Sequence, residues 1–572
     1  MDSNPTSARG DRVLRFAAGL VTVLAVLAVI ALFWSSDGES TEQAPTSSTV
    51  EHTSPAEPAT TVGGVGTDTA SPVTNSVTGT TSGPVTRTTI ETATGTGAPS
   101  EESPSQPTST SSPGPAEDRD CSPRIPEGFR PTETDPVLAG FEISQATFTC
   151  AHEVGLAFAT NPRAVATLAA GGIRGPILLV GEWFDDRLMT ELGRLAPERI
   201  VAAGINAGLL RDALAGFTLE PVAVDWDASF PSGATDHDHV WLVDPVMPSA
   251  LAALASQLGV GVVAVEGDLR ALPAPEREMI AGAGTVALLT DLEDDAAWQL
   301  EVVRRSEEIP GGGLLMFGEG DGRRLVAVYG HPVTSALGVL GEQGPQEGVE
   351  RLRSIMEGYG GDGSIVLPTF EIIATVASAG AGRDGDYSSE TARDVIRPWI
   401  EIAAANDVYV VLDLQPGRTD FLTQAKIYEE FLRLPHVGLA LDPEWRLKPD
   451  QVHLRQIGTV DAAEINRVVE WLAAIVREEA LPQKLLIVHQ FRFSMITNRP
   501  LIETPPELAV LIQMDGQGSL EAKYSTWNAL TLESDADQFW WGWKNFYDED
   551  SPTATPDQVL ALTPVPVFVS FQ

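Results

Sequence analysis

The stretch VYVVLDLQPGRTDFLTQAKIYEEFLRLPHVGLALDPEW, residues 408–445, decides the fold of this chain. Two short apolar runs, Val408–Leu412 and Val437–Leu441, flank an amphipathic segment, Phe421–Leu434. A strand, a helix and a second strand in this order favour parallel strands joined by a crossover helix. The stretch therefore predicts a βαβ unit, in which the carboxyl ends of both strands lie on the same side.

The same alternation continues on both sides of this stretch, from residue 324 to residue 572. Eight apolar runs separated by helical patterns over this length match the size of a (β/α)8 barrel. We therefore predict an α/β protein with a (β/α)8 barrel over residues 314–572. The eight predicted strands are Leu325–Tyr329, Ile365–Val376, Val408–Leu412, Val437–Leu441, Lys484–Val488, Leu508–Ile512, Phe539–Trp543 and Val565–Phe571.

Two carboxylates follow neighbouring predicted strands, Asp413 in VVLD and Glu444 in LALDPE. Catalytic groups of (β/α)8 barrels lie after the carboxyl ends of the strands. Glycoside hydrolysis uses two carboxyl groups on either side of the scissile bond. We expect Glu444 to be the proton donor and Asp413 the base or nucleophile. The alternative for Asp413 is a purely structural role as the cap of the next turn.

Other polar and aromatic residues at the same ends are predicted to bind substrate. The tryptophans would stack on sugar rings, and the polar groups would orient the carboxyl pair or hold hydroxyls or an acidic substituent. The alternatives are a turn at Asp442 and packing of the tryptophans in the barrel wall. The predicted binding residues are Arg418, Asp442, Trp445, His489, Gln490, Asp515, Trp541 and Trp543.

No cofactor and no metal are expected. The sequence has neither GxxxxGK[ST] nor a GxGxxG that opens a helix, and it lacks an HExxH pair. By architecture alone, the C-terminal segment looks like the glycosidase group of barrels, without a matching catalytic motif. The segment is therefore a candidate glycoside hydrolase.

A strand-helix-strand-helix-strand pattern occurs twice within residues 121–313, which predicts a duplicated α/β domain with parallel sheets. The opening PILLVGEW, residues 176–183, and PERIVAAGINAGLLRDAL, residues 197–214, resemble the cell wall-binding repeat 2 family. The resemblance covers residues 174–291. It implies attachment to anionic wall polymer, and the two copies differ from the three that the family usually carries.

The segment Phe16–Trp34 contains nineteen residues without a charge. At about 28 Å it is long enough to cross the hydrocarbon core of a bilayer. Arginines at positions 9, 12 and 15 place the tail, residues 1–15, in the cytoplasm. The segment predicts a single-pass plasma membrane protein with extracytoplasmic C-terminal domains and the lipid bilayer as a partner. A cleaved signal peptide is the alternative.

Residues 35–120 are rich in Thr, Ser, Pro and Gly, which predicts a disordered stalk. Cys121 and Cys150 follow the stalk and are the two cysteines of the chain. We expect them to form one structural disulfide, worth roughly 3 kcal/mol in the chain-entropy model. Free buried cysteines and a catalytic thiol are the alternatives.

The formal net charge of −42 would repel nucleic acid. Together, these features predict an envelope protein of a Gram-positive-type cell, whose barrel cleaves or transfers glycosidic bonds of cell-wall polysaccharide. The alternative is a non-catalytic protein or scaffold that binds cell-wall glycan or anionic wall polymer.

Overall fold

The computed structural model describes residues 119–572, without 127–131, 134, 182–183, 185, 229–237, 244–254, 256–257, 290–294, 319–321 and 362. The predicted cytoplasmic tail, membrane-spanning segment and all of the stalk but its last two residues lie outside the described residues.

The predicted single-pass location in the plasma membrane needs correction. Within the described part of the chain, no helix is both long enough and apolar enough to span a bilayer. The segment Phe16–Trp34, on which this location and the bilayer contact rested, is not part of what the structure describes.

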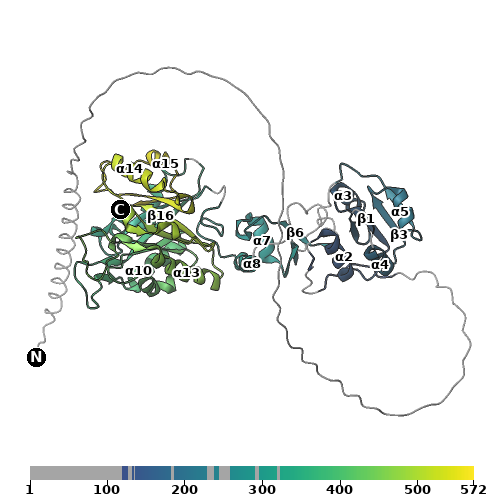
Figure 1. The fold of residues 1–572 in the computed structure, drawn as a ribbon, viewed down its shortest axis with the longest axis horizontal. Helices are drawn as coiled ribbons and strands as arrows, with labels where there is room; N and C mark the ends of the chain where they lie inside the picture. Colours follow the sequence, from purple (N-terminus) through teal and green to yellow (C-terminus); the bar gives the residue numbers. More distant parts are fainter. Residues whose placement is uncertain are drawn as a thin grey trace, which may run out of the picture. The chain divides into compact units, whose positions relative to one another are not determined.

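Eight parallel strands of the C-terminal segment close into a barrel, which confirms the predicted barrel (Figure 1). Each strand pairs with the next in the order β8, β9, β11, β12, β14, β16, β17 and β18, and β18 pairs back with β8. A short antiparallel strand, β10 (Ser388–Glu390), extends β9. The barrel strands are β8 (Arg324–Gly330), β9 (Val366–Ala377), β11 (Tyr409–Leu414), β12 (Val437–Leu441), β14 (Lys484–His489), β16 (Leu508–Met514), β17 (Trp540–Asn545) and β18 (Phe568–Phe571).

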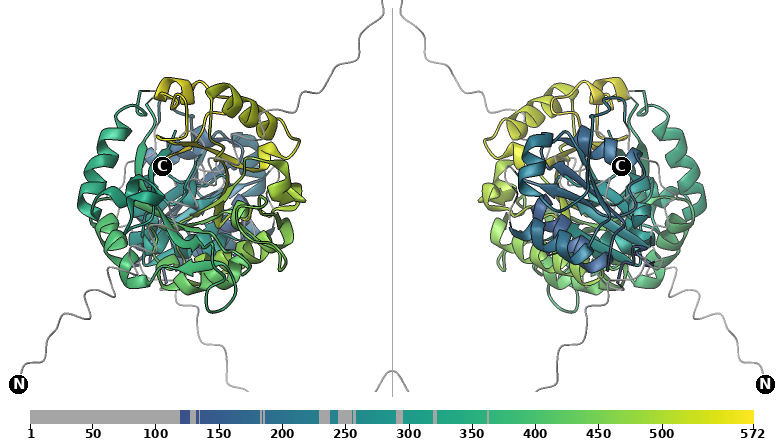
Figure 2. Two further views of the ribbon diagram at one scale, coloured as in Figure 1. Left: turned by 90° about the vertical axis from the view of Figure 1, so that its left-hand side faces the viewer. Right: turned by 90° about the vertical axis from the view of Figure 1, so that its right-hand side faces the viewer.

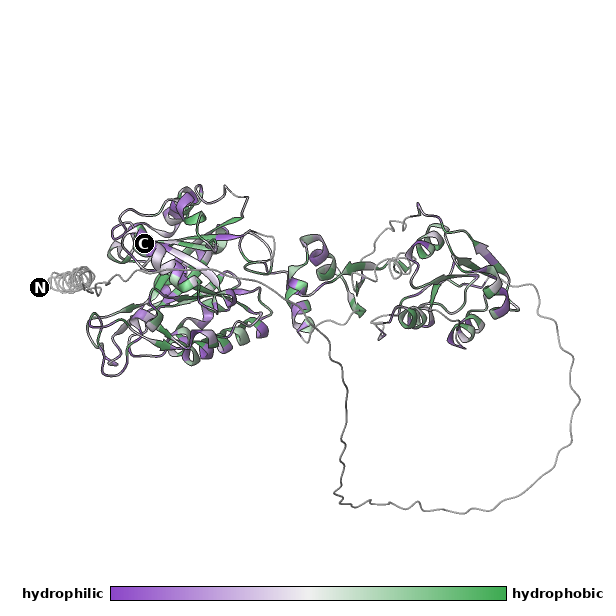
Figure 3. Cartoon of the chain, turned by 45° about the horizontal axis from the view of Figure 1, so that its top comes forward, coloured by the Kyte–Doolittle hydropathy of each residue, from purple (hydrophilic) through white to green (hydrophobic). Residues whose placement is uncertain are grey.

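Amphipathic helices surround the strands as a ring in the left view of Figure 2. Purple and green residues alternate along these helices in Figure 3. α13 (Ala462–Glu478) begins at Asp461, whose side chain accepts a hydrogen bond from the amide of Ala463, and it buries its apolar face against the strands. The other helices of the barrel are α9 (Pro345–Met356), α10 (Arg393–Ala405), α11 (Phe421–Ala425), α12 (Glu429–Leu432), α14 (Leu520–Thr531) and α15 (Pro556–Leu560).

The predicted helix over residues 421–434 is broken into α11 and α12 by a 3-10 turn, Lys426–Tyr428. The buried hydroxyl of Tyr428 donates to the carbonyl oxygen of Ala374 at 2.6 Å. This bond holds the turn against β9, so the chain bends where the sequence pattern predicts one continuous helix.

The interior of the barrel is apolar at the amino end of the strands. Val411, Ala440, Ile487 and Leu511 belong to this inner cluster. Ile309, Met316 and Phe317, which precede β8, are buried in the same cluster and close this end. We call these three residues the plug.

Residues 121–313 form two small parallel sheets, of order β2-β1-β3-β4 and β6-β5-β7. The structure adds the central strand β1, which the sequence pattern did not predict. The strands are β1 (Glu153–Phe158), β2 (Ile177–Val180), β3 (Arg199–Ala203), β4 (Leu219–Val222), β5 (His239–Val243), β6 (Gly261–Ala264) and β7 (Thr285–Leu289). The helices are α2 (Pro136–Thr147), α3 (Pro162–Ala170), α4 (Asp186–Leu195), α5 (Ala207–Ala213), α7 (Ala274–Gly282) and α8 (Ala296–Arg305).

Cys121 and Cys150 form a disulfide, as predicted. It ties the segment before α2 to the start of β1 across a sequence separation of 29 residues.

Candidate active site at the carboxyl end of the barrel

The inner face of the barrel changes from apolar to polar along the strands. Side chains two residues apart in a strand point to the same face, so each inward apolar residue fixes the direction of the next inward residue. On β11, for example, inward Val411 is followed by Asp413. The inward polar residues toward this end of the strands, counting the residue directly after β12, are Tyr329, Glu371, Asp413, Asp442, His489, Gln513, Lys544 and Ser570.

His489 lies at the centre of this polar ring. Its Nδ1 lies 3.1 Å from Oδ2 of Asp515, and its Nε2 lies 3.2 Å from Oε1 of Glu371. Burial alone would lower the pKa of His489, but the hydrogen bonds with Asp515 and Glu371 raise it well above its ordinary value. Both ring nitrogens face carboxylates, and this environment favours the imidazolium form of His489.

Glu371 is the carboxylate that balances this imidazolium. Its side chain is fully buried, and the hydroxyl of Ser570 donates to its Oε2. Burial opposes ionisation, but the hydrogen bond from His489 and the charge of Lys544 lower the pKa of Glu371. Glu371 and His489 thus form an ion pair at the base of the site.

Asp413 is held on one side only. The hydroxyl of Tyr329 donates to its Oδ2 at 2.9 Å, while its buried Oδ1 has no hydrogen-bond partner. Burial raises the pKa of Asp413 to about 6, although the charge of His489 acts in the opposite direction. Lys544 places its Nζ 3.4 Å from the centre of the Tyr329 ring.

Glu444 lies in a 3-10 turn, Pro443–Trp445, directly after β12. Oδ1 of Asp442 accepts from the amide of Glu444 at 3.3 Å and so fixes the start of this turn. Burial and then the charge of Asp515 raise the pKa of Glu444 to about 8. Burial and then Glu444 raise the pKa of Asp442 well above its ordinary value.

The structure thus brings five of the predicted site residues together. Asp413, Asp442, Glu444, His489 and Asp515 act on one another electrostatically at the same end of the barrel. The predicted turn role of Asp442 is present as well, because its side chain caps the turn that carries Glu444.

Two predicted binding residues point away from this cluster. The side chain of Gln490 accepts from Arg499 at 2.9 Å and donates to the carbonyl of Arg492. The guanidinium of Arg418 donates to the carbonyl of Gln451 at 2.8 Å and lies over the ring of Tyr387. Both side chains are therefore engaged in the structure of the loops.

The tryptophans differ in their surroundings. Trp541 and Trp543 are buried between β17 and α14, where both lie against the ring of Trp527. A sugar platform needs an accessible ring face, which neither has, so both belong to the barrel wall. Trp445 is half-buried beside His453, with ring centres 5.3 Å apart, and it stays a predicted platform.

Ligand atoms of Asp413, Asp442 and His489 all lie within 4.8 Å of one another, a spacing that suits a metal ion. However, a histidine that binds a metal must offer a lone pair. Both nitrogens of His489 already meet carboxylates, so coordination would have to break one of these contacts. This bonding favours the imidazolium over a metal ligand.

Comparisons with family models and with curated proteins find no match. Among solved structures, Cwp8 from Clostridium difficile has 11% sequence identity and a TM-score of 0.16, over 30% of this chain and 32% of that chain. Cwp6 from Clostridium difficile has 11% identity and a TM-score of 0.18, over 55% of this chain and 62% of that chain. The chain thus spans less than two thirds of either protein. Neither similarity carries an argument, and membership of the cell wall-binding repeat 2 family stays a prediction.

Sequence reasoning missed the site residues that lie within strands rather than after them. Glu371 is the one charged residue of the predicted strand Ile365–Val376, and this isolated charge was the available signal. Gln513 and Lys544 gave a similar signal, each as a polar residue at the end of an apolar run. Whether these side chains point into the barrel or away from it can be decided only from the register of the closed barrel.

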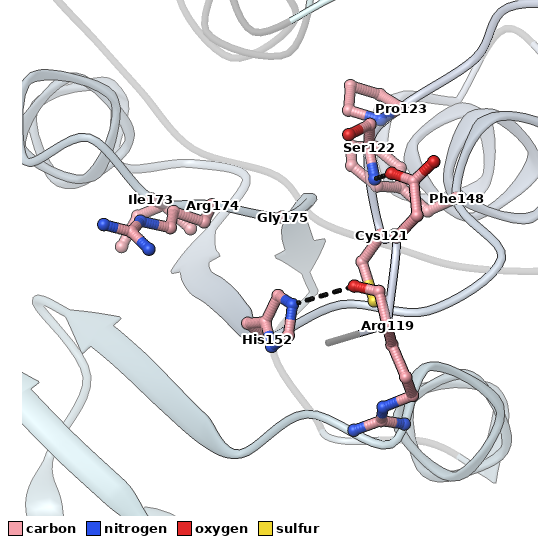
Figure 4. A pocket seen from close by; sticks show the side chains of 10 residues that line it. Arg119, Cys121, Ser122, Pro123, Phe148, His152, Ile173, Arg174 and Gly175 are labelled. Atoms are coloured by element: carbon pink, nitrogen blue, oxygen red, sulfur yellow. Dashed lines mark hydrogen bonds between the residues drawn. The ribbon is translucent and has the colours of Figure 1, made fainter. Parts of the chain in front are cut away.

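A surface hollow of about 370 Å³ lies in the α/β domain, beside the disulfide (Figure 4). His152 lines it and contacts the carbonyl oxygen of Arg119 at 3.2 Å and the carboxylate of Glu198 at 3.0 Å. These contacts hold the segment before α2 against the sheet, which is a structural role.

Proposed function

We propose that the barrel cleaves or transfers glycosidic bonds of cell-wall polysaccharide by general acid–base catalysis, with Glu444 as the proton donor and Asp413 as the base or nucleophile. The difference in pKa between the two groups carries this proposal, at about 8 for Glu444 and about 6 for Asp413. Near neutral pH, Glu444 is then mostly protonated and Asp413 mostly ionised. Glycosidases need one carboxyl group in each of these states.

The neighbours of the two groups support these roles. Tyr329 holds Oδ2 of Asp413 and leaves Oδ1 without a partner, so this oxygen can attack or accept a proton. The charge of Asp515 acts on Glu444 and favours the protonated form that a general acid requires. The imidazolium of His489 favours the ionised form of Asp413.

The proposal is tested with Glu444→Gln and Asp413→Asn, assayed for release of reducing ends from wall polysaccharide. Each change is expected to lower kcat by about 10²- to 10⁴-fold. Because an activated aryl glycoside needs little acid assistance, Glu444→Gln should retain more activity on it than Asp413→Asn. Glu401→Gln, at an exposed position of α10, is the control.

Unchanged turnover in either folded variant would contradict the assignment. A second candidate function, glycan binding without catalysis, is favoured by the burial of Asp413 and Asp442, which are 0% and 2% exposed. Wild-type protein that binds wall polysaccharide but never releases reducing ends would support this second candidate.

A further inference from the structure

Gln513 is a buried side chain with both polar atoms unsatisfied. It is 0% exposed, and neither its Nε2 nor its Oε1 has a hydrogen-bond partner among the described residues. A buried polar group without a partner destabilises a protein, so this amide needs a partner that the folded chain does not supply.

The unsatisfied amide faces the polar ring. Gln513 is the register partner of His489 on the neighbouring parallel strand, and register partners point to the same side of a sheet. Leu511, two residues earlier on β16, belongs to the inner apolar cluster. Gln513 therefore lies directly above the apolar interior, on the inner face of β16.

Two further oxygens at this end of the barrel also lack partners. Asp515 follows Gln513 on the same face of the chain, and its Oδ1 is unpaired, as is Oδ1 of Asp413. Both side chains are more than nine-tenths buried. β12 and β14 separate β11 from β16, so these atoms enclose the interior from two sides.

The unpaired atoms define the chemistry of a matching ligand. Three oxygens accept hydrogen bonds, whereas the amide nitrogen of Gln513 is the one unpaired donor group among them. A ligand must therefore donate more hydrogen bonds than it accepts. Adjacent hydroxyl groups of a sugar ring satisfy this pattern, because each hydroxyl both donates and accepts.

The charges of the cluster further restrict the class of ligand that can bind. The raised pKa values of Asp442 and Glu444 favour their neutral forms. The remaining carboxyl groups of the cluster, Glu371, Asp413 and Asp515, still outnumber its cationic groups, Lys544 and His489. A uronate or phosphate that entered this space would be repelled, since like charges interact strongly where water is excluded.

We propose that Gln513, with Asp515 and Asp413, forms a subsite that binds a neutral sugar unit through its free hydroxyl groups and rejects anionic units. The inference rests on the proposed action on glycans and names the substrate class. Gln513 is then a specificity-determining residue, and anionic wall polymer is not the substrate of the barrel.

The test measures binding affinity, so its outcome does not depend on catalytic turnover. Glu444→Gln protein is titrated calorimetrically with mannopentaose, cellopentaose, laminaripentaose and a galactan pentasaccharide as neutral probes, and with a galacturonate pentamer as the anionic probe. We expect at least one neutral probe to bind, and the affinity to fall about tenfold or more when Gln513→Met is added. Binding of the galacturonate alone, no binding of any neutral probe, or no effect of Gln513→Met would each overturn the proposal.

A stability measurement separates the subsite from a merely structural glutamine. Gln513→Met removes an unsatisfied amide at nearly constant volume and should raise Tm in the free protein. Gln424→Met is the matched control, because Gln424 is equally buried but accepts from Thr375 at 2.7 Å and donates to Ser388 at 2.9 Å. The control should lower Tm and leave glycan binding unchanged.

A Tm that falls in Gln513→Met would show that the amide is satisfied within the protein and would overturn the subsite. The two proposals fail in different ways. Neutral glycan that binds through Gln513 without any turnover contradicts only the catalytic proposal, whereas turnover that is insensitive to Gln513→Met contradicts only the subsite.

Discussion

His489 determines the charge pattern of the site through single hydrogen bonds. Its two nitrogens join Glu371 and Asp515, carboxylates from different strands. The resulting positive charge lies near Asp413 and lowers its pKa against the effect of burial. Glu444 is partly buried, and the charge of Asp515 adds to the effect of this burial on its pKa. Two carboxyl groups of the same barrel end therefore have different affinities for a proton.

The first prediction concerns the pH profile of the proposed activity. Asp413 must be ionised, so the rate should fall as the pH drops below about 6. Glu444 must keep its proton, so the rate should fall again as the pH rises through about 8. We expect a bell-shaped profile of kcat/KM between these limbs, and loss of the alkaline limb in Glu444→Gln. An alkaline limb that persists in this variant would show that another group is the acid.

The second prediction concerns stability. The pKa of Glu444 in the folded protein, about 8, is higher than its ordinary value of 4.5. Between these values the folded state holds a proton that the unfolded state has lost, so stability falls as the pH rises through this window. Glu444→Gln does not titrate, and its Tm should rise relative to wild type between about pH 5 and 8. Melting curves at several pH values measure this difference, and a constant difference would contradict the raised pKa.

At the scale of the elements, one strand shows how much the sequence could predict. The run FWWGWKNF gave β17 correctly, because aromatic residues in a short apolar run favour a strand. Its alternation assigns Trp541 and Trp543 to one face and Lys544 to the other. Which face is inside depends on the register of the closed barrel, and the sequence pattern alone assigned the wrong residues of β17 to the site.

Carboxylates after strands were easier to predict than polar residues within them. Asp413, Asp442 and Asp515 end or follow apolar runs, and the topology of a parallel barrel places such residues at one opening. Gln490 was also predicted to line this opening, but it is one residue beyond inward His489. Its side chain therefore points to the opposite face, where it bonds with Arg499. The predicted helix over residues 421–434 failed for another reason, a tertiary hydrogen bond of Tyr428.

The third prediction separates the wall from the sugar platform. Trp543 is 0% exposed against α14, so Trp543→Ala should lower the free energy of unfolding by about 3–5 kcal/mol and leave glycan affinity unchanged in the folded protein. Trp445→Ala should change stability by about 1 kcal/mol or less, because the ring is half-buried, and should weaken glycan binding. Urea unfolding and calorimetric titration measure both effects. Weaker glycan binding by folded Trp543→Ala would contradict the assignment of Trp543 to the barrel wall.

At the scale of the whole molecule, the disulfide and the proposed active site belong to different parts of the chain. Cys121 and Cys150 join segments at the start of the α/β domain, whereas the polar ring lies in the barrel, beyond residue 324. The boundary at residue 313 stays a prediction. The contacts that join the two parts, such as Arg270 to the carbonyl oxygen of Pro506 and Arg477 to Asp295, come from residues after β6 and not from the disulfide segment. We therefore expect reduction of the disulfide to leave the barrel unchanged.

The fourth prediction follows from this separation. Reduction of the disulfide, or Cys121→Ser with Cys150→Ser, should destabilise the α/β domain by roughly 3 kcal/mol, the chain-entropy value for a loop of this length. Enzymatic activity and the thermal transition of the barrel should not change. Calorimetric melting with and without reductant measures both transitions, and a barrel transition that shifts as much as the first would contradict independent behaviour.

The plug changes where the chain can be cut. Ile309, Met316 and Phe317 fill the amino end of the barrel although they precede its first strand. A protease that cleaved between the plug and β8 would expose the apolar floor to water, and the released fragment would be prone to aggregate. The smallest fragment that can leave the α/β domain and stay in solution therefore begins before Ile309.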